Sequence, residues 1–148
     1  MHGTIPPCIG KLDHLEQLYL YRNHLTGNIP SELGMLKKLT HLSLGENQLG
    51  GVIPDEIGNL NDLQYLYIFG NNIEGRIPNS IGSLSNLVHL GLWNNKLTGI
   101  IPPELRKLNK LQYIALNGNS LSGSLSTATF FAMPEVKVLH FKDKSCGR

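Results

Sequence analysis

The stretch that decides the fold is Leu63–Pro78, LQYLYIFGNNIEGRIP, because its pattern recurs at one fixed interval on both sides of it. An asparagine and a proline mark the repeat most plainly. The asparagines are Asn23, Asn47, Asn71, Asn95 and Asn119, and the prolines are Pro6, Pro30, Pro54, Pro78 and Pro102. The interval is 24 residues. A fixed period of this length is the signature of a solenoid, in which each repeat packs on its neighbours. The sequence therefore predicts one repeat architecture over nearly the whole chain.

The repeat unit reads LxxLxLxxNxLxGxIPxxLGxL, as it does from Leu39 to Leu60. This unit resembles the leucine-rich repeat, and in particular the 24-residue plant-specific subclass seen in receptor-like protein ectodomains and polygalacturonase-inhibitor-type proteins. The resemblance covers roughly Gly3 to Asp143. It implies an α/β fold, a right-handed leucine-rich-repeat solenoid shaped as a horseshoe arc. A parallel β-sheet would line its concave face, and short 3₁₀ or helical turns its convex face.

The repeat phase divides the expected single leucine-rich-repeat domain, residues 1–148, into three parts. Residues 3–14 form a partial N-terminal repeat, residues 15–134 form five repeats of about 24 residues, and residues 135–148 form a C-terminal half-repeat that acts as a cap. The expected strands are centred on Leu18–Leu20, Leu42–Leu44, Leu66–Ile68, Leu90–Leu92 and Ile114–Leu116. The apolar pattern of Ile114 returns at Leu139, a single place later than the regular period would put it, which predicts a sixth strand.

Asparagine stands at the ninth place of each unit, where the strand ends. Its side-chain amide can donate to and accept from backbone groups that the bend leaves unpaired in the interior. An unpaired buried amide costs about 1–3 kcal/mol. We therefore interpret the asparagine ladder as structural, and it consists of Asn23, Asn47, Asn71, Asn95 and Asn119.

The third, fifth, seventh and eighth places of each unit are expected to point outward from the concave face. All five tyrosines and the single tryptophan of the chain fall in these places. Aromatic residues favour strands and pack across neighbouring ones, which explains part of this bias. Tyrosine, tryptophan and arginine are also the residues enriched at interface hot spots. The predicted binding residues are Tyr19, Tyr21, Arg22, His41, Glu46, Tyr65, Tyr67, Phe69, His89, Trp93 and Tyr113.

Small residues occupy the remaining outward places, namely Ser43, Gly45, Gly70, Gly91 and Ala115. We expect them to leave hollows between the aromatic side chains, into which protruding side chains of a partner would fit. Trp93 and Tyr67 are the expected anchors of such a contact.

Catalysis is not predicted, and neither is a metal, a cofactor or a nucleic-acid partner. The outward carboxylates Glu46 and Asp143 lie four strands apart, or about 19 Å, whereas a glycosidase pair needs about 5–9.5 Å. His41 and His89 are separated by Tyr65, too far apart for one tetrahedral metal. Charged residues make up 16% of the chain and the net charge is +2, without the basic stripe of a nucleic-acid binder.

The sequence favours a cytoplasmic location. No apolar run of about 18 residues could span a membrane, the N-terminus has no apolar signal region, and no N-x-S/T sequon is present. Cys8 and Cys146 are separated by five or six repeats, on the order of 25 Å, which exceeds the roughly 7 Å limit for a disulfide. An extracellular location would follow if the chain is a fragment of a longer one.

The predicted function is that of a protein- or peptide-binding module that uses its aromatic concave face. Three alternatives stay open. The family resemblance implies an extracellular ligand-sensing or enzyme-inhibitor fragment of a receptor-like protein. The same aromatic residues would suit carbohydrate binding. A structural, self-assembling scaffold would associate end to end through its N-terminal edge.

Overall fold

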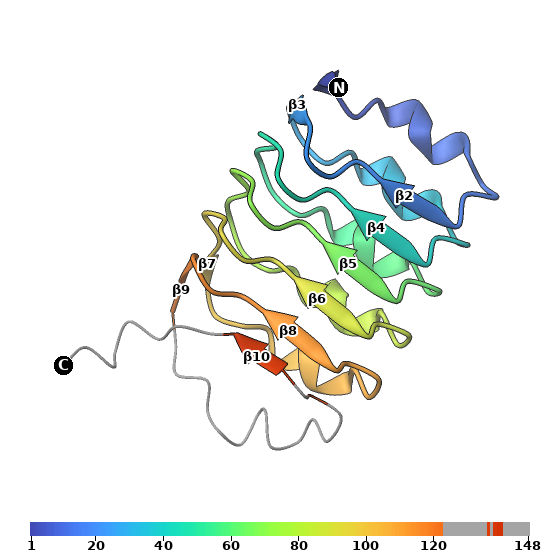
Figure 1. Cartoon of the computed structure of the whole chain (residues 1–148). Coiled ribbons are helices and arrows are strands. Elements are labelled where there is room, and N and C mark those ends of the chain that lie inside the picture. The colour runs from blue at the N-terminus through green and yellow to red at the C-terminus, as the bar shows by residue number, and fades with distance from the viewer. Residues whose placement is uncertain (123–135, 137, 141–148) are drawn as a thin grey trace.

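The computed structural model describes residues 1–122, 136 and 138–140, and it forms an arc of stacked repeats (Figure 1). One sheet contains β2 (Gln17–Tyr19), β4 (His41–Ser43), β5 (Tyr65–Tyr67), β6 (His89–Gly91), β8 (Tyr113–Ala115) and β10 (Val138–His140). The opposite face carries the 3₁₀ segments η1 (Pro7–Lys11), η2 (Ser31–Met35), η3 (Asp55–Asn59), η4 (Asn79–Ser83) and η5 (Pro103–Lys107). The predicted solenoid, with a parallel sheet on one face and short 3₁₀ turns on the other, is confirmed.

All strands of the main sheet are parallel, in the order β10-β8-β6-β5-β4-β2. Each residue pairs with its counterpart one repeat later, so His41 lies beside Tyr65. The interval between β8 and β10 is one residue longer than the other intervals. Ile114 therefore pairs with Leu139, as the sequence predicts. This register aligns the outward places of successive repeats into columns across the sheet.

The inward residues of the strands form one continuous core with residues from the 3₁₀ segments. Leu42, Leu66 and Leu90 have no exposed surface, and neither do Ile57 and Ile81 on the opposite side. Full burial of such a side chain contributes about 1.5–3 kcal/mol. Since every repeat supplies the same inward set, the core runs the length of the arc, and the outward columns are held on a rigid support.

The asparagine side chains pair with backbone groups at the end of each strand. Asn71 Nδ2 donates to the carbonyls of Leu44, Ile68 and Phe69 at 3.0–3.1 Å, and its Oδ1 accepts from Leu49 N at 3.0 Å. The same arrangement recurs at Asn47 and Asn95. Each of these side chains thus connects two successive repeats through buried polar groups.

The segment that follows each ladder asparagine lies along one side of the arc, which we call the flank. The sequence predicted only a turn in this segment. Short parallel strands lie there: β1 (His2–Thr4) pairs with β3 (His24–Thr26), and β7 (Thr98–Gly99) pairs with β9 (Ser120–Leu121). Isolated bridges join Asn28 to Gly50 and Arg76 to Thr98. The flank therefore adds backbone hydrogen bonds between repeats. These bonds could not be predicted from the alternation of apolar residues.

The proposed C-terminal cap, residues 135–148, lies mostly outside the described residues, of which β10 and residue 136 are the only members there. Cys146 and Asp143 also lie outside them. Cys8 is exposed on η1.

Candidate binding surface

The main sheet brings together the predicted aromatic and imidazole side chains on its outer side, and we call this set the concave aromatic surface. It comprises Tyr19, His41, Tyr65, Tyr67, Phe69, His89, Trp93 and Tyr113, which contact one another across strands β2 to β8. Apart from the exposed Tyr19, all of its members are half-buried. The predicted residues Tyr21, Arg22 and Glu46 lie beside it, after the ends of β2 and β4.

The third column of the repeat alternates tyrosine and histidine rings. His41 stacks on Tyr65 with ring centroids 4.4 Å apart, and Tyr65 meets His89 edge-on at 4.9 Å. His89 in turn lies 5.4 Å from Tyr113, while Tyr19 lies 6.1 Å from His41. The third-column rings of β4, β5, β6 and β8, together with Tyr19 from the fifth column of β2, therefore form a continuous series of ring contacts over five strands.

A second cluster joins the fifth and seventh columns. The Phe69 and Trp93 rings are stacked, and the ring of Tyr67 meets both of them edge-on at 6.3 and 6.5 Å. Edge-to-face and stacked aromatic pairs each contribute about 0.5–1.5 kcal/mol beyond their burial. The three rings thus hold one another in place before any partner binds.

The expected hollows at Gly45 and Gly91 are not present, and that prediction was wrong. A Cβ added at Gly45 would lie 2.5 Å from a ring atom of Phe69, and one at Gly91 would lie 2.5 Å from Trp93 and 2.6 Å from Tyr67. Neighbouring rings therefore cover these glycines. Ser43 and Ala115 are buried as well. The small residues allow the aromatic rings to pack directly on the sheet, so no space is left there for side chains of a partner.

Tyr67 and His89 are also joined by a hydrogen bond of 2.6 Å between the phenol oxygen and Nδ1 of the imidazole. Burial raises the pKa of the Tyr67 phenol, and the nearby Tyr113 and Tyr65 add to this effect. Burial lowers the pKa of the His89 imidazole. The centre of the surface therefore favours the neutral forms of both groups.

The end of the surface near β2 is more open and carries charge. Tyr19 and Tyr21 are 54% and 50% exposed. Arg22 Nε donates to Glu46 Oε2 at 2.7 Å, and this hydrogen bond together with the carboxylate charge raises the pKa of the Arg22 guanidinium. Both residues have a left-handed backbone, with φ near 53°. This end thus offers two accessible phenol rings beside an ion pair.

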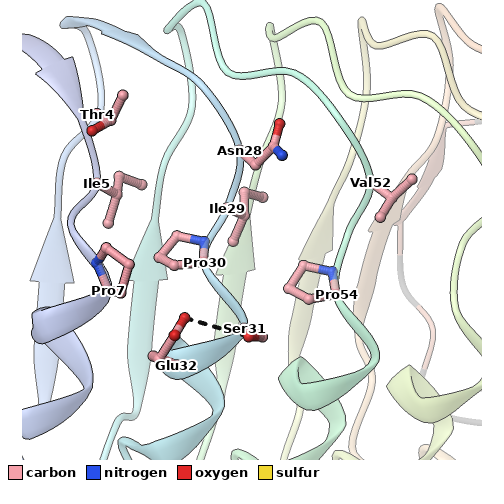
Figure 2. Close-up of a pocket in the computed structure, with 10 residues that line it drawn as sticks. All are labelled: Thr4, Ile5, Pro7, Asn28, Ile29, Pro30, Ser31, Glu32, Val52 and Pro54. Atoms are coloured by element: carbon pink, nitrogen blue, oxygen red, sulfur yellow. Dashed lines mark hydrogen bonds between the residues drawn. The ribbon is translucent and has the colours of Figure 1, made fainter.

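A separate hollow of about 410 Å³, which the sequence did not predict, lies on the flank (Figure 2). The buried Ile5 and Ile29 belong to its wall, and Ser31 Oγ donates to Glu32 Oε2 at 3.3 Å beside them. Its other lining residues are Thr4, Pro7, Asn28, Pro30, Val52 and Pro54. They lie at or just before the starts of η1, η2 and η3, and Thr4, Asn28 and Val52 hold equivalent places in successive repeats, so the hollow follows from the repeat itself.

The described residues include no group of three histidine, cysteine, aspartate or glutamate side chains that could hold a metal ion. Glu46, the outward carboxylate near the aromatic residues, is held by Arg22. Over the described part of the chain, no helix is long and apolar enough to cross a membrane.

The leucine-rich-repeat family model matches residues 13–73, and a second leucine-rich-repeat model matches residues 86–108. No curated protein matches the chain significantly. The chain belongs to the leucine-rich-repeat family, and domains of this kind are typically non-enzymatic binding modules.

Solved structures similar to the chain include plant receptors. A TDR receptor is 35% identical with a TM-score of 0.92, over 95% of this chain and 24% of that one. The Arabidopsis receptor kinase HAESA, in complex with the peptide hormone IDA and the co-receptor SERK1, is 34% identical with a TM-score of 0.83, over 97% and 25%. A plant ice-binding protein is 34% identical with a TM-score of 0.81, over 87% and 42%. The chain thus spans about a quarter of each receptor.

These similarities do not support the cytoplasmic location that the sequence favoured. That interpretation depended on the missing signal region, disulfide and sequon, whereas the similar structures include receptors, one of them in complex with a peptide hormone. They favour the extracellular alternative.

Proposed function

We propose that the chain is a protein- or peptide-binding module whose partner lies along the concave aromatic surface. The observation that carries this proposal is the unbroken series of ring contacts from Tyr19 to Tyr113 on the outer side of the sheet. Rings that are already packed lose little conformational freedom when a partner binds, so more of the contact energy appears as affinity. The peptide hormone bound to HAESA supports the same class of ligand.

Within this surface the accessible residues make the main contacts. Tyr19 and Tyr21 have the most area to bury, and tyrosine supplies a large apolar ring with a polar tip. The ion pair of Arg22 and Glu46 supplies orientation, because opposite charges on a partner favour one register. The half-buried rings of Tyr67 and Trp93 shape the floor beneath the partner.

The proposal extends to the location and chemistry of the chain. We place the module outside the cell, in a receptor-like protein, on the strength of the similarity to receptors, and we propose that it acts without catalysis. Sugar binding is less favoured, because one face of the Trp93 ring is covered by Phe69 and is closed to a stacked sugar.

A displayed library of random peptides tests the proposal. Binders selected on the chain should lose at least about tenfold in affinity for the variants Tyr19→Ala and Tyr21→Ala, since interface tyrosines are common hot spots. Val52→Ala and Ile100→Ala are matched controls, because these flank residues are 54% and 60% exposed and lie off the sheet. Binders that respond to the flank variants and not to the tyrosine variants would overturn the proposal.

A further inference from the structure

The imidazole of His41 is held by Thr40, and this contact determines which ring nitrogen carries the proton. Thr40 Oγ1 lies 2.8 Å from His41 Nδ1 and 2.9 Å from Glu16 O. Both are hydrogen-bond distances, and each bond holds one proton. The Glu16 carbonyl has no proton to give, so the single proton of the Thr40 hydroxyl goes to that carbonyl. The hydroxyl therefore accepts from His41, whose Nδ1 carries the ring proton.

With its proton on Nδ1, the neutral ring of His41 has a bare lone pair at Nε2. Nε2 lies at the end of the ring away from the backbone, and His41 forms no hydrogen bond other than that to Thr40 among the described residues. The neutral ring can accept a hydrogen bond at Nε2 but cannot donate one. Protonation reverses this, because both nitrogens of an imidazolium donate.

The phenol of Tyr65 lies beside this nitrogen. Tyr65 and His41 pair in register on β5 and β4, and their rings are stacked with centroids 4.4 Å apart and planes 18° from parallel. The two side chains therefore extend from the sheet in the same direction. The Tyr65 hydroxyl forms no hydrogen bond with the described part of the chain. A phenol O–H and an imidazole nitrogen thus lie next to each other, both without an internal partner.

No carboxylate of the concave surface is available to a protonated His41. The side chains that face it from the neighbouring strands are those of Gln17, Tyr19 and Tyr65. Of this group only the imidazole changes charge between pH 5 and pH 8 in its ordinary range. Glu46, the carboxylate beside the surface, is held by Arg22. The positive charge that His41 gains on protonation therefore has no counterion within the described residues.

We propose that Tyr65 and His41 form a recognition site for a side-chain carboxylate of an acidic peptide, and that the site binds it only when His41 is protonated. One carboxylate oxygen accepts from the Tyr65 hydroxyl and the other from Nε2–H of the imidazolium. A carboxylate only accepts hydrogen bonds, so the lone pair at Nε2 of the neutral ring repels it. The inference rests on the proposed function and adds to it the chemistry of the partner and a condition for binding.

His89, in the same column two strands away, is held differently. Its Nδ1 lies 2.6 Å from the Tyr67 hydroxyl. This hydroxyl can donate to a neutral imidazole or accept from a charged one. Nothing there forces the proton of the neutral ring onto Nδ1. Of the two histidines, His41 alone is therefore restricted to accepting at Nε2 in its neutral form.

The protonation of His41 is tested without any ligand. Nitrogen-15 NMR of the imidazole at pH 8 distinguishes a protonated ring nitrogen from a bare one. We expect Nε2 of His41 to be the bare nitrogen in the wild type. Thr40→Val removes the hydroxyl acceptor, so it should move part of the proton population to Nε2. A wild-type ring with its proton on Nε2 would overturn the inference and leave the proposed function as it stands.

Two displayed peptide libraries test the carboxylate. One has glutamate and the other glutamine at a central position, with random residues around it. The peptides are joined to their carrier through the C-terminus, so they have no free terminal carboxylate and differ only in the fixed side chain. At pH 5 the glutamate binders should lose at least about tenfold in affinity when the glutamate is replaced by glutamine, since charge-assisted hydrogen bonds are roughly twice as strong as neutral ones.

The same glutamate peptides test the role of the proton. Histidine titrates near about 6.5 in model peptides, and apparent affinity falls with the fraction of the binding-competent form. Affinity for the wild type should therefore fall about tenfold between pH 5 and pH 7.5. His41→Gln takes up no proton and should show a fall of less than about twofold. His24→Gln, at an exposed site on β3, is the matched control and should keep the wild-type pH profile.

The outcomes separate this inference from the proposed function. Equal affinity of glutamate and glutamine peptides, or a pH profile that His41→Gln leaves unchanged, would overturn the carboxylate site while the concave surface still binds peptides. A failure to select binders from either library at either pH would overturn the proposed function and this inference with it.

Discussion

The rings of Phe69 and Trp93 lie face to face, with their centroids 3.9 Å apart and their planes 5° from parallel. They come from neighbouring repeats, and each ring lies over a glycine: Phe69 over Gly45 and Trp93 over Gly91. A side chain at either glycine would occupy the place of the ring. The shape of the concave aromatic surface therefore depends on its small residues as much as on its large ones.

The variant Gly91→Ala tests this dependence. Its Cβ would lie 2.5 Å from Trp93 and 2.6 Å from Tyr67, so one or both rings must move. We expect a changed fluorescence emission from the single tryptophan and a stability loss of about 1–3 kcal/mol from overpacking. Gly50→Ala is the matched control, because nothing lies within 4 Å of a Cβ there. Unaltered emission in Gly91→Ala would show that the rings do not rest on this glycine.

The asparagine ladder predicts that replacement by alanine reduces stability by different amounts at different asparagines. Asn71→Ala removes four hydrogen bonds, three of them buried, to three carbonyls and one amide. Each buried group left unpaired costs about 1–3 kcal/mol. Asn23→Ala removes two carbonyl contacts and the bond from the Met1 ammonium in a half-buried site. Urea unfolding should therefore show a loss for Asn71→Ala larger by at least about 2 kcal/mol. Equal losses would mean that the interior groups find other partners.

The lowered pKa of His89 predicts a pH dependence of stability. The unfolded imidazole titrates near about 6.5, and burial places the folded-state pKa below that value. As the pH falls below about 6.5, the unfolded chain gains its proton first, so the free energy of unfolding decreases. The decrease ends once the pH is below the folded-state pKa.

The variant His89→Gln should flatten this pH dependence, since glutamine does not titrate and can still pair with Tyr67. The measurement is the urea midpoint between pH 7.5 and pH 5. His24→Gln, at an exposed site on β3, leaves His89 in place and serves as the control. A variant at position 89 that loses as much stability at low pH as the wild type would assign the effect to other groups.

The repeat architecture was predictable from the sequence because one period determines many positions at once. Shifting Leu66 by one repeat length in either direction identifies Leu42 and Leu90, and all three are fully buried in the core. The columns of outward-facing residues were predictable from the alternation of inward and outward residues along each strand. Their members did come together, although the structure leaves their role in binding a proposal.

The detailed form of the surface was not predictable, because it depends on contacts between repeats. Alternation shows that Gly91 faces outward, but it does not show that the ring of Trp93 turns back over it. The flank strands β1 and β3 pair through backbone groups, which leave no apolar pattern. The eighth column also looked like a set of ligand-facing side chains, whereas in the structure it is a backbone bend. Arg22, Glu46, Gly70, Asn94 and Gly118 all have positive φ there.

That bend gives the last prediction, for Glu46→Gly. A left-handed backbone is unfavourable for a residue with a Cβ and easy for glycine, which occupies the same place at Gly70. Strained residues of this kind cluster at functional sites, so we expect Glu46 to act through its charge beside Arg22.

We expect Glu46→Gly to be at least as stable as the wild type in urea unfolding, and to bind selected peptides more weakly. Glu46→Gln keeps the strained backbone and removes only the charge, so it should lose affinity without gaining stability. A clear loss of stability in Glu46→Gly would instead mean that the ion pair with Arg22 supports the fold. The glutamate would then be explained by structure alone.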